Sequence, residues 1–229
     1  MSAVPAALTK ALGQLGDRRI VTVVIKSVGL TLALFAGTGV ALYVPLANLI
    51  KSYGYDGGWA GLAAAVLVPV LMWLLFRVVA MAVLQFFADE VVAAVEARHY
   101  PALATQAKPL PFRRDLANSL RGLARALGYN LLAVPLAAVL AFTGFGPALV
   151  FLAVNAVLLG RELTDMAWLR HCGSDTGGNP AGKADRLLLG ACVAGIMLVP
   201  GLGLLGPVIG AAAGTHLVLR RLELYEGAR

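Results

Sequence analysis

"PGLGLLGP", residues 200–207, decides how the fold is interpreted, because it is compatible with two unrelated structures. Its glycines, Gly201-x-Gly203-x-x-Gly206, match the turn that cradles the pyrophosphate of a dinucleotide. That turn needs a strand before it and a helix and second strand after it, whereas here an apolar stretch precedes it and only 22 residues follow Pro207. We therefore interpret the stretch as the turn of a helical hairpin.

The composition is that of a membrane protein. The 229 residues are 59% hydrophobic and 14% charged, with a mean hydropathy of +0.81, whereas a soluble domain carries about 25% charged residues. Apolar stretches cover residues 20–50 and 59–76, and about 20 apolar residues suffice to cross a bilayer. The sequence predicts two long membrane helices, residues 18–50 and 59–98. No cleavage site follows a short apolar region, so the first helix is expected to be retained.

The formal net charge of +7 has two interpretations, a nucleic-acid partner or a basic surface facing anionic lipid. All Lys and Arg residues except Lys51 and Arg77 fall on one side of the membrane if only the two long helices cross it. The positive-inside rule makes that side cytoplasmic. The distribution therefore favours membrane lipid over nucleic acid as the partner of the basic residues.

Residues 1–16 form a predicted amphipathic segment. Val4, Ala7, Leu8, Ala11, Leu12 and Leu15 recur at helical spacing, and Lys10 stands among them. This pattern is typical of a helix that lies on the membrane surface.

Two later apolar segments, residues 127–161 and 185–221, are each interrupted by glycine and proline. Their halves contain 12 to 14 apolar residues, which make only about 18 to 21 Å of helix. Each segment is either one kinked spanning helix or a hairpin that enters the membrane and returns. Basic residues before, between and after the segments favour two re-entrant hairpins, because only hairpins leave all three basic groups on the cytoplasmic side.

The two segments resemble each other. Gly144-x-Gly146 matches Gly201-x-Gly203, and Pro147 and Pro207 each stand 14 residues before an arginine. A polar residue, Asn155 or Thr215, follows each proline by eight positions. Two copies of one hairpin would explain the match, as in transporters that surround a site with repeated elements. Independent convergence of short hairpins on similar spacing is the alternative.

"NAVLLGRELTDMAWLRH" (155–171) and "LVPGLGLLGPVIGAAAGTHLVLRR" (198–221) resemble stretches of the CysZ sulfate permeases and the related etoposide-induced-protein family. Residues 86–98 and 16–25 extend the resemblance over most of the chain. The resemblance implies an all-α integral membrane protein with an N-terminal interfacial helix, two long transmembrane helices and two half-penetrating hairpins. It further implies a homo-oligomer in the bacterial inner membrane that takes up sulfate for cysteine synthesis, with sulfite as a further candidate substrate.

The same resemblance assigns sulfate binding to Gly16, Arg18 and Arg19, where the family has a Gly-apolar-Arg-Arg motif. Physical chemistry agrees, because free N–H groups at a helix start, an open glycine and two guanidinium groups all favour a dianion. Asp17 departs from the motif. Its carboxylate would repel sulfate and is expected to cap the helix, competing for the same N–H groups. An interfacial anchor is the alternative role of the two arginines.

Further polar residues are candidates for lining or gating an anion path: Glu96, Asn155, Arg161, Glu162 and His216. A solvated ion-pair network is the alternative around Arg161 and Glu162. His216 could couple transport to protons, because histidine titrates near neutral pH. No C-x-x-C or H-E-x-x-H spacing is present, so we expect neither metal nor cofactor.

The sequence is compatible with two functions. One is sulfate translocation through oligomer-associated hairpins, with Arg18 and Arg19 attracting the anion. The other is a membrane-organising or assembly protein without transport activity. An enzyme is disfavoured because no constellation of His, Asp and Glu is evident. The sequence does not specify the coupling ion, the oligomer number or the membrane orientation.

Overall fold

The computed structural model describes residues 3–52, 62–63, 65–66, 87–108, 111–172, 178–199 and 202–226. All regular elements in these ranges are helices, which confirms the all-α prediction. The chain divides into two compact units, residues 21–87 and residues 1–20 together with 88–229. The predicted second long helix, 59–98, lies mainly outside the described residues, although its last part, 87–98, is helical and the helix continues to residue 99.

Helix α2, Arg18–Ser52, supplies the first long membrane helix. Its 35 residues make about 52 Å of helix, more than the hydrocarbon core requires. It is one of three described helices that are long and apolar enough to cross a membrane, the others being Leu116–Thr143 and Gly146–Trp168. These three helices confirm the membrane class inferred from composition.

Helix α1, Val4–Gly13, precedes α2 and begins with a proline in its first turn. Its buried residues Val4, Ala7 and Ala11, followed by Gln14, form a stripe along one side. This stripe packs against α8, Gly206–Glu226. The amphipathic pattern therefore serves contact with protein, and a position on the membrane surface stays a prediction.

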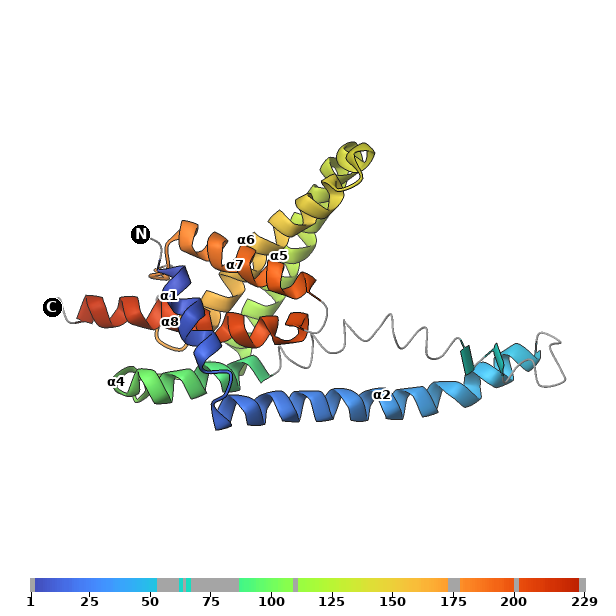
Figure 1. The fold of residues 1–229 in the computed structure, drawn as a ribbon, viewed down its shortest axis with the longest axis horizontal. Coiled ribbons are helices and arrows are strands. Elements are labelled where there is room, and N and C mark those ends of the chain that lie inside the picture. Colours follow the sequence, from blue (N-terminus) through green and yellow to red (C-terminus); the bar gives the residue numbers. More distant parts are fainter. Residues whose placement is uncertain are drawn as a thin grey trace. The chain divides into compact units, whose positions relative to one another are not determined.

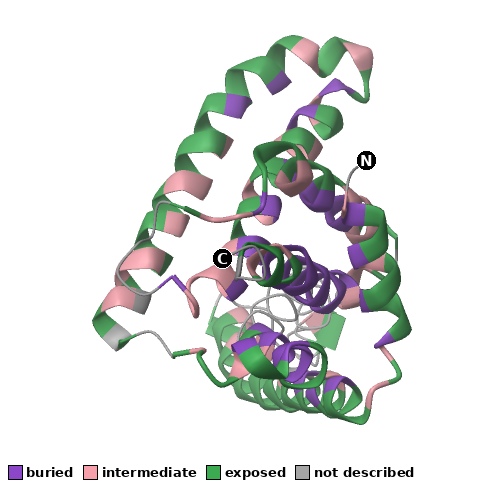
Figure 2. Ribbon diagram, turned by 90° about the vertical axis from the view of Figure 1, so that its left-hand side faces the viewer, coloured by how far each residue is buried: buried purple, intermediate pink, exposed green. Residues whose placement is uncertain are grey.

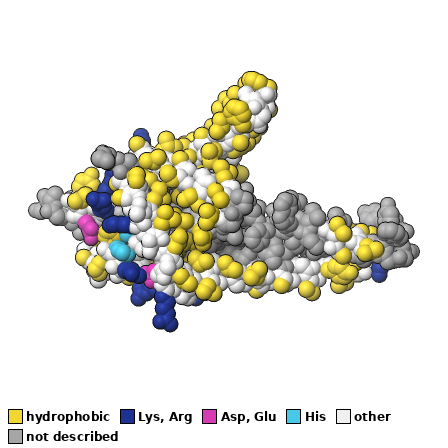
Figure 3. All heavy atoms as spheres, viewed as in Figure 1, with side chains coloured by type: hydrophobic (Ala, Val, Ile, Leu, Met, Phe, Trp, Pro, Cys, Tyr) yellow, Lys and Arg dark blue, Asp and Glu magenta, His cyan; other side chains and the backbone are white. Residues whose placement is uncertain are grey.

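Helices α5, Phe112–Val139, and α6, Gly146–Trp168, pack against each other as a hairpin (Figure 1). A short 3-10 helix, η1 (Leu140–Thr143), and Gly144 with φ +76° reverse the chain between them. The helices are about 42 and 34 Å long. They exceed the predicted 18 to 21 Å because each continues through polar residues beyond its apolar run. In Figure 3 the visible surface of the projecting hairpin tip is free of charged side chains.

A second hairpin joins α7, Lys183–Leu198, to α8. The 3-10 helix η2, Leu202–Leu205, lies directly before α8, as η1 lies shortly before α6. Both returning helices begin with Gly-Pro, at Gly146 and Gly206. The structure thus pairs Gly146 with Gly206, which agrees with the predicted match of Pro147 with Pro207 and not with that of Gly146 with Gly203. Pro200 and Gly201 lie outside the described residues.

Small residues allow α6, α7 and α8 to cross closely. A Cβ on Gly160 would overlap the backbone carbonyl of Arg186, and a Cβ on Gly190 would overlap that of Ala156. On α8, Gly210 and Gly214 lie against Leu163 of α6. Backbone approach at glycine is the usual way in which membrane helices pack. Figure 2 shows the result, with buried residues gathered along α8.

Candidate functional site

The start of α2 carries the predicted sulfate-binding residues on an open surface. Gly16, Arg18 and Arg19 are exposed, and no atom beyond Gly16 and its two chain neighbours lies within 4 Å of the position that a Cβ on Gly16 would take. The Arg19 backbone N–H donates to Asp17 Oδ1 at 3.3 Å. This is the expected helix cap, so Asp17 occupies one of the N–H groups that an anion would use.

The second oxygen of Asp17 binds Arg98. Arg98 Nη1 donates to Asp17 Oδ2 at 2.5 Å, and the Asp17 side chain is only 13% exposed. The hydrogen bond from Arg98 lowers the pKa of Asp17 below its ordinary value, so the carboxylate is ionised at neutral pH. Arg98 therefore offsets much of the negative charge that Asp17 adds at the start of α2.

Glu96 is buried in a separate cluster. Its carboxylate is 2% exposed and receives Arg170 Nη2 at 3.0 Å, with Arg170 Nε at 3.1 and 3.2 Å from the two oxygens. His171 Nε2 lies 3.0 Å from Glu96 Oε1. The two partners follow α6 directly, so this cluster ties the end of α6 to the helical residues 87–99.

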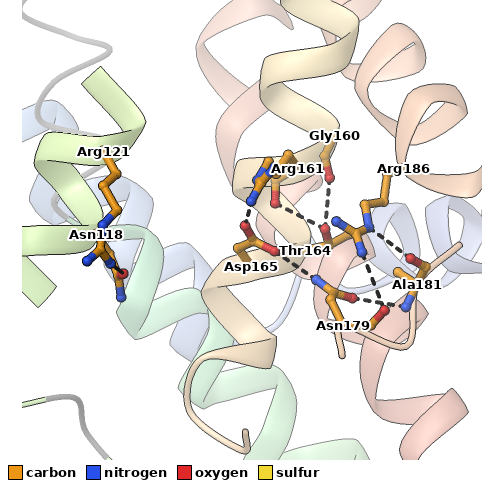
Figure 4. A network of polar contacts seen from close by, with 9 residues as sticks. All are labelled: Asn118, Arg121, Gly160, Arg161, Thr164, Asp165, Asn179, Ala181 and Arg186. Atoms are coloured by element: carbon orange, nitrogen blue, oxygen red, sulfur yellow. Dashed lines mark hydrogen bonds and ion pairs between the residues drawn. The ribbon is translucent and has the colours of Figure 1, made fainter. Parts of the chain in front are cut away.

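Arg161 lies in a network around the loop between α6 and α7 (Figure 4). Its Nε contacts Asp165 Oδ2 at 3.3 Å, and Asn179 Nδ2 donates to Asp165 Oδ1 at 2.9 Å. Arg186 Nε donates to the Ala181 carbonyl at 2.8 Å. These bonds hold the loop that precedes α7, which favours the structural interpretation of Arg161.

Asn155 and Glu162 are exposed on α6. They are seven residues apart, two helical turns, and so share one face of the helix. Glu162 therefore does not belong to the buried cluster of Glu96. A role of this face in an anion path stays a prediction.

His216 is 2% exposed in the middle of α8. Its Nε2 lies 2.6 Å from Gln14 Nε2, and its Nδ1 lies 2.9 Å from the Tyr100 hydroxyl. If the Gln14 amide donates to Nε2, the ring is neutral and Nδ1–H faces Tyr100. Burial raises the pKa of Tyr100 to about 12, so its hydroxyl stays protonated at neutral pH. His216 thereby joins α8 to Gln14, just after α1, and to the residue before α4, Pro101–Ala104.

Residues 7–207 match the family described as "Sulfate transporter CysZ/Etoposide-induced protein 2.4". The chain belongs to this family. The match includes Gly16, Arg18, Arg19 and the Glu96 cluster, and it ends before His216. Searches of curated proteins and of solved structures find no match to the chain.

Three side chains that contact the candidate residues of this CysZ/etoposide-induced-protein family member were not predicted from the sequence. Gln14 is a polar residue on the buried stripe of α1, and that position could have marked it as a partner of another buried polar group. Tyr100 and His171 carry no comparable signal, because their partners are 116 and 75 residues away in sequence. Within the described ranges, no group of three or more His, Cys, Asp and Glu side chains could hold a metal ion.

Proposed function

We propose that the chain transports sulfate across the bacterial inner membrane for cysteine synthesis, with Gly16, Arg18 and Arg19 binding the anion at the start of α2. The family match is the observation that carries the proposal. Sulfite, a smaller oxyanion, is proposed as a second substrate of the same site.

The local chemistry at the start of α2 supports this assignment. Arg18 and Arg19 are exposed at the N-terminal end of a 35-residue helix, where the helix dipole adds positive potential. Asp17 lowers the affinity by repulsion, but its ion pair with Arg98 limits that effect. The site is therefore expected to bind sulfate weakly and to release it readily, as passage of an anion requires.

The membrane arrangement is proposed from the α5–α6 hairpin. Phe142 and Phe145 at its tip are 83% and 66% exposed, and each would cost roughly 1.5 to 3 kcal/mol if it stayed in water. Leu116–Thr143 is long and apolar enough to cross a membrane, but its most apolar stretch, residues 129–142 at the end of α5 and in η1, is only about 21 Å long, which is shorter than the hydrocarbon core. The hairpin therefore enters the bilayer partway, and the arginines at the start of α5 remain at the cytoplasmic surface.

We propose further that the chain forms a homo-oligomer. The face of α5 that carries Leu116, Leu120, Leu123, Leu127 and Leu131 is between 47% and 73% exposed. These leucines recur three or four residues apart, so they form one continuous apolar strip that suits contact with a second copy.

The experiment is equilibrium binding of radiolabelled sulfate to the purified protein in neutral detergent. Arg18→Ala/Arg19→Ala should weaken binding at least about tenfold, since one charge-assisted hydrogen bond contributes about 1.5 to 3 kcal/mol. The control Arg113→Ala/Arg121→Ala removes two other exposed arginines, on α5, and should bind as the wild type does. Unchanged affinity in Arg18→Ala/Arg19→Ala would refute the site.

A further inference from the structure

A cavity of about 330 Å³ lies between α1 and the second half of α8. None of its lining residues belongs to the start of α2 or to the Glu96 cluster. Its volume is within the range of small-molecule sites. The cavity is therefore a candidate binding site separate from the proposed sulfate site.

One part of the cavity wall is apolar. Ala6 and Ala7 contribute from α1, and Leu217 and Leu224 contribute from α8. This apolar part offers no hydrogen bonds to the oxygens of a bare inorganic anion. The walls instead suit a ligand with an apolar portion.

Three cations also line the cavity: Lys10 from α1, and Arg220 and Arg221 from α8. Arg221 is oriented by Asp185 and by the Pro180 carbonyl, to which Nη1 donates at 2.7 Å. Lys10 and Arg220 are exposed.

The acids near these cations do not cancel them. Asp185 binds Arg221, and Glu223 follows Arg220 by three residues on α8. His216, which also lines the cavity, contacts Gln14 and Tyr100. Three cations against two acids leave a net positive charge beside an apolar wall.

We propose that this cavity binds an anionic phospholipid, with the head-group phosphate on Lys10 and Arg220 and the start of an acyl chain against the alanines and leucines. Lysine and arginine next to membrane helices attract anionic lipid. The exposed side chains of α1 include Leu12, at 50%, which suits a helix at the head-group level. The bound lipid connects α1 to α8 from outside, next to the internal Gln14–His216 bond.

The test is a lipid titration of the purified protein in neutral detergent, followed by thermal unfolding. Short-chain phosphatidylglycerol should raise the unfolding midpoint, whereas short-chain phosphatidylcholine at the same concentration should not. Lys10→Ala/Arg220→Ala should weaken the apparent phosphatidylglycerol affinity at least about tenfold, consistent with the loss of two contacts of about 1 kcal/mol. The control Arg113→Ala/Arg121→Ala should respond as the wild type does.

A second variant tests the space inside the cavity without changing its charges. Ala6→Trp keeps all three cations, and Ala6 is exposed, so the variant should fold. Its indole should fill part of the cavity and remove most of the response to phosphatidylglycerol. Equal responses to both lipids, or a wild-type response in both variants, would overturn the proposal. So would an equal rise with inorganic phosphate or sulfate that Lys10→Ala/Arg220→Ala abolishes, because that would identify a site for a free anion.

Discussion

Glu96→Gln is predicted to destabilise the protein strongly, because it removes the charge of a buried ion pair and keeps the shape. Glu96 accepts from Arg170 and contacts His171, with nitrogen–oxygen distances of 3.0 to 3.2 Å. Removal of one partner of a buried pair costs about 3 to 5 kcal/mol. Arg170 is 21% exposed and can regain some water, so we expect the lower end of that range, about 3 kcal/mol.

The assay is thermal unfolding of the purified protein, followed by loss of the folded peak in size-exclusion chromatography. For a chain of this size, about 3 kcal/mol lowers the midpoint by roughly 6 to 12 °C. Glu162→Gln is the matched control, because Glu162 is exposed, and a surface change of about 0.5 kcal/mol or less shifts the midpoint by about 2 °C at most. Adding Arg170→Met to Glu96→Gln should cost less than the sum of the two single changes. A Glu96→Gln midpoint within about 2 °C of the wild type would refute the reasoning.

Three further predictions follow from other parts of the structure. Gly160→Ala should lower the unfolding midpoint, because its Cβ would overlap the Arg186 carbonyl. The control Gly195→Ala has open space around it and should leave the midpoint unchanged. Equal midpoints for the two variants would contradict the close crossing of α6 and α7. Asp17→Asn should be less stable than the wild type at pH 7. Arg98 holds the folded pKa of Asp17 below 3.8, so this stabilisation is present above that value and is lost as the pH falls through the folded pKa. A difference in stability between Asp17→Asn and the wild type that stays constant from pH 7 to pH 2 would argue against the Asp17–Arg98 ion pair. Phe142→Cys and Arg121→Cys can be compared in liposomes that contain the protein without Cys172 and Cys192. Phe142→Cys should react with a membrane-impermeant maleimide far more slowly than Arg121→Cys, because the hairpin tip lies in the bilayer. Equal rates would place the tip in water.

The helices and their interruptions could be predicted from the sequence because they depend on local chemistry. Apolar length identified α2, and the interruptions by glycine and proline marked the turns that precede α6 and α8. The cap at Asp17 followed from its position before Arg18. The lengths of α5 and α6 were underestimated because apolar runs measure the part suited to lipid, whereas backbone hydrogen bonding continues through arginine and alanine.

The polar partners could not be predicted, because they depend on contacts between distant parts of the chain. Glu96 was singled out, but its pairing with Arg170 and His171 requires the end of α6 to lie against residues 87–99. His216 was read as a titrating group near the membrane, and the structure adds Gln14 and Tyr100 as its partners.

The central claim is that the chain moves sulfate and that Arg18 and Arg19 attract it. The most direct measurement is uptake of radiolabelled sulfate into liposomes that contain only this protein. The account predicts uptake above that of protein-free liposomes, a reduction of at least about tenfold in Arg18→Ala/Arg19→Ala, and unchanged uptake in Arg113→Ala/Arg121→Ala. No uptake by the folded wild type, together with no sulfate binding, would contradict transport and favour a membrane-organising role. Equal uptake by Arg18→Ala/Arg19→Ala would contradict the assignment of the site.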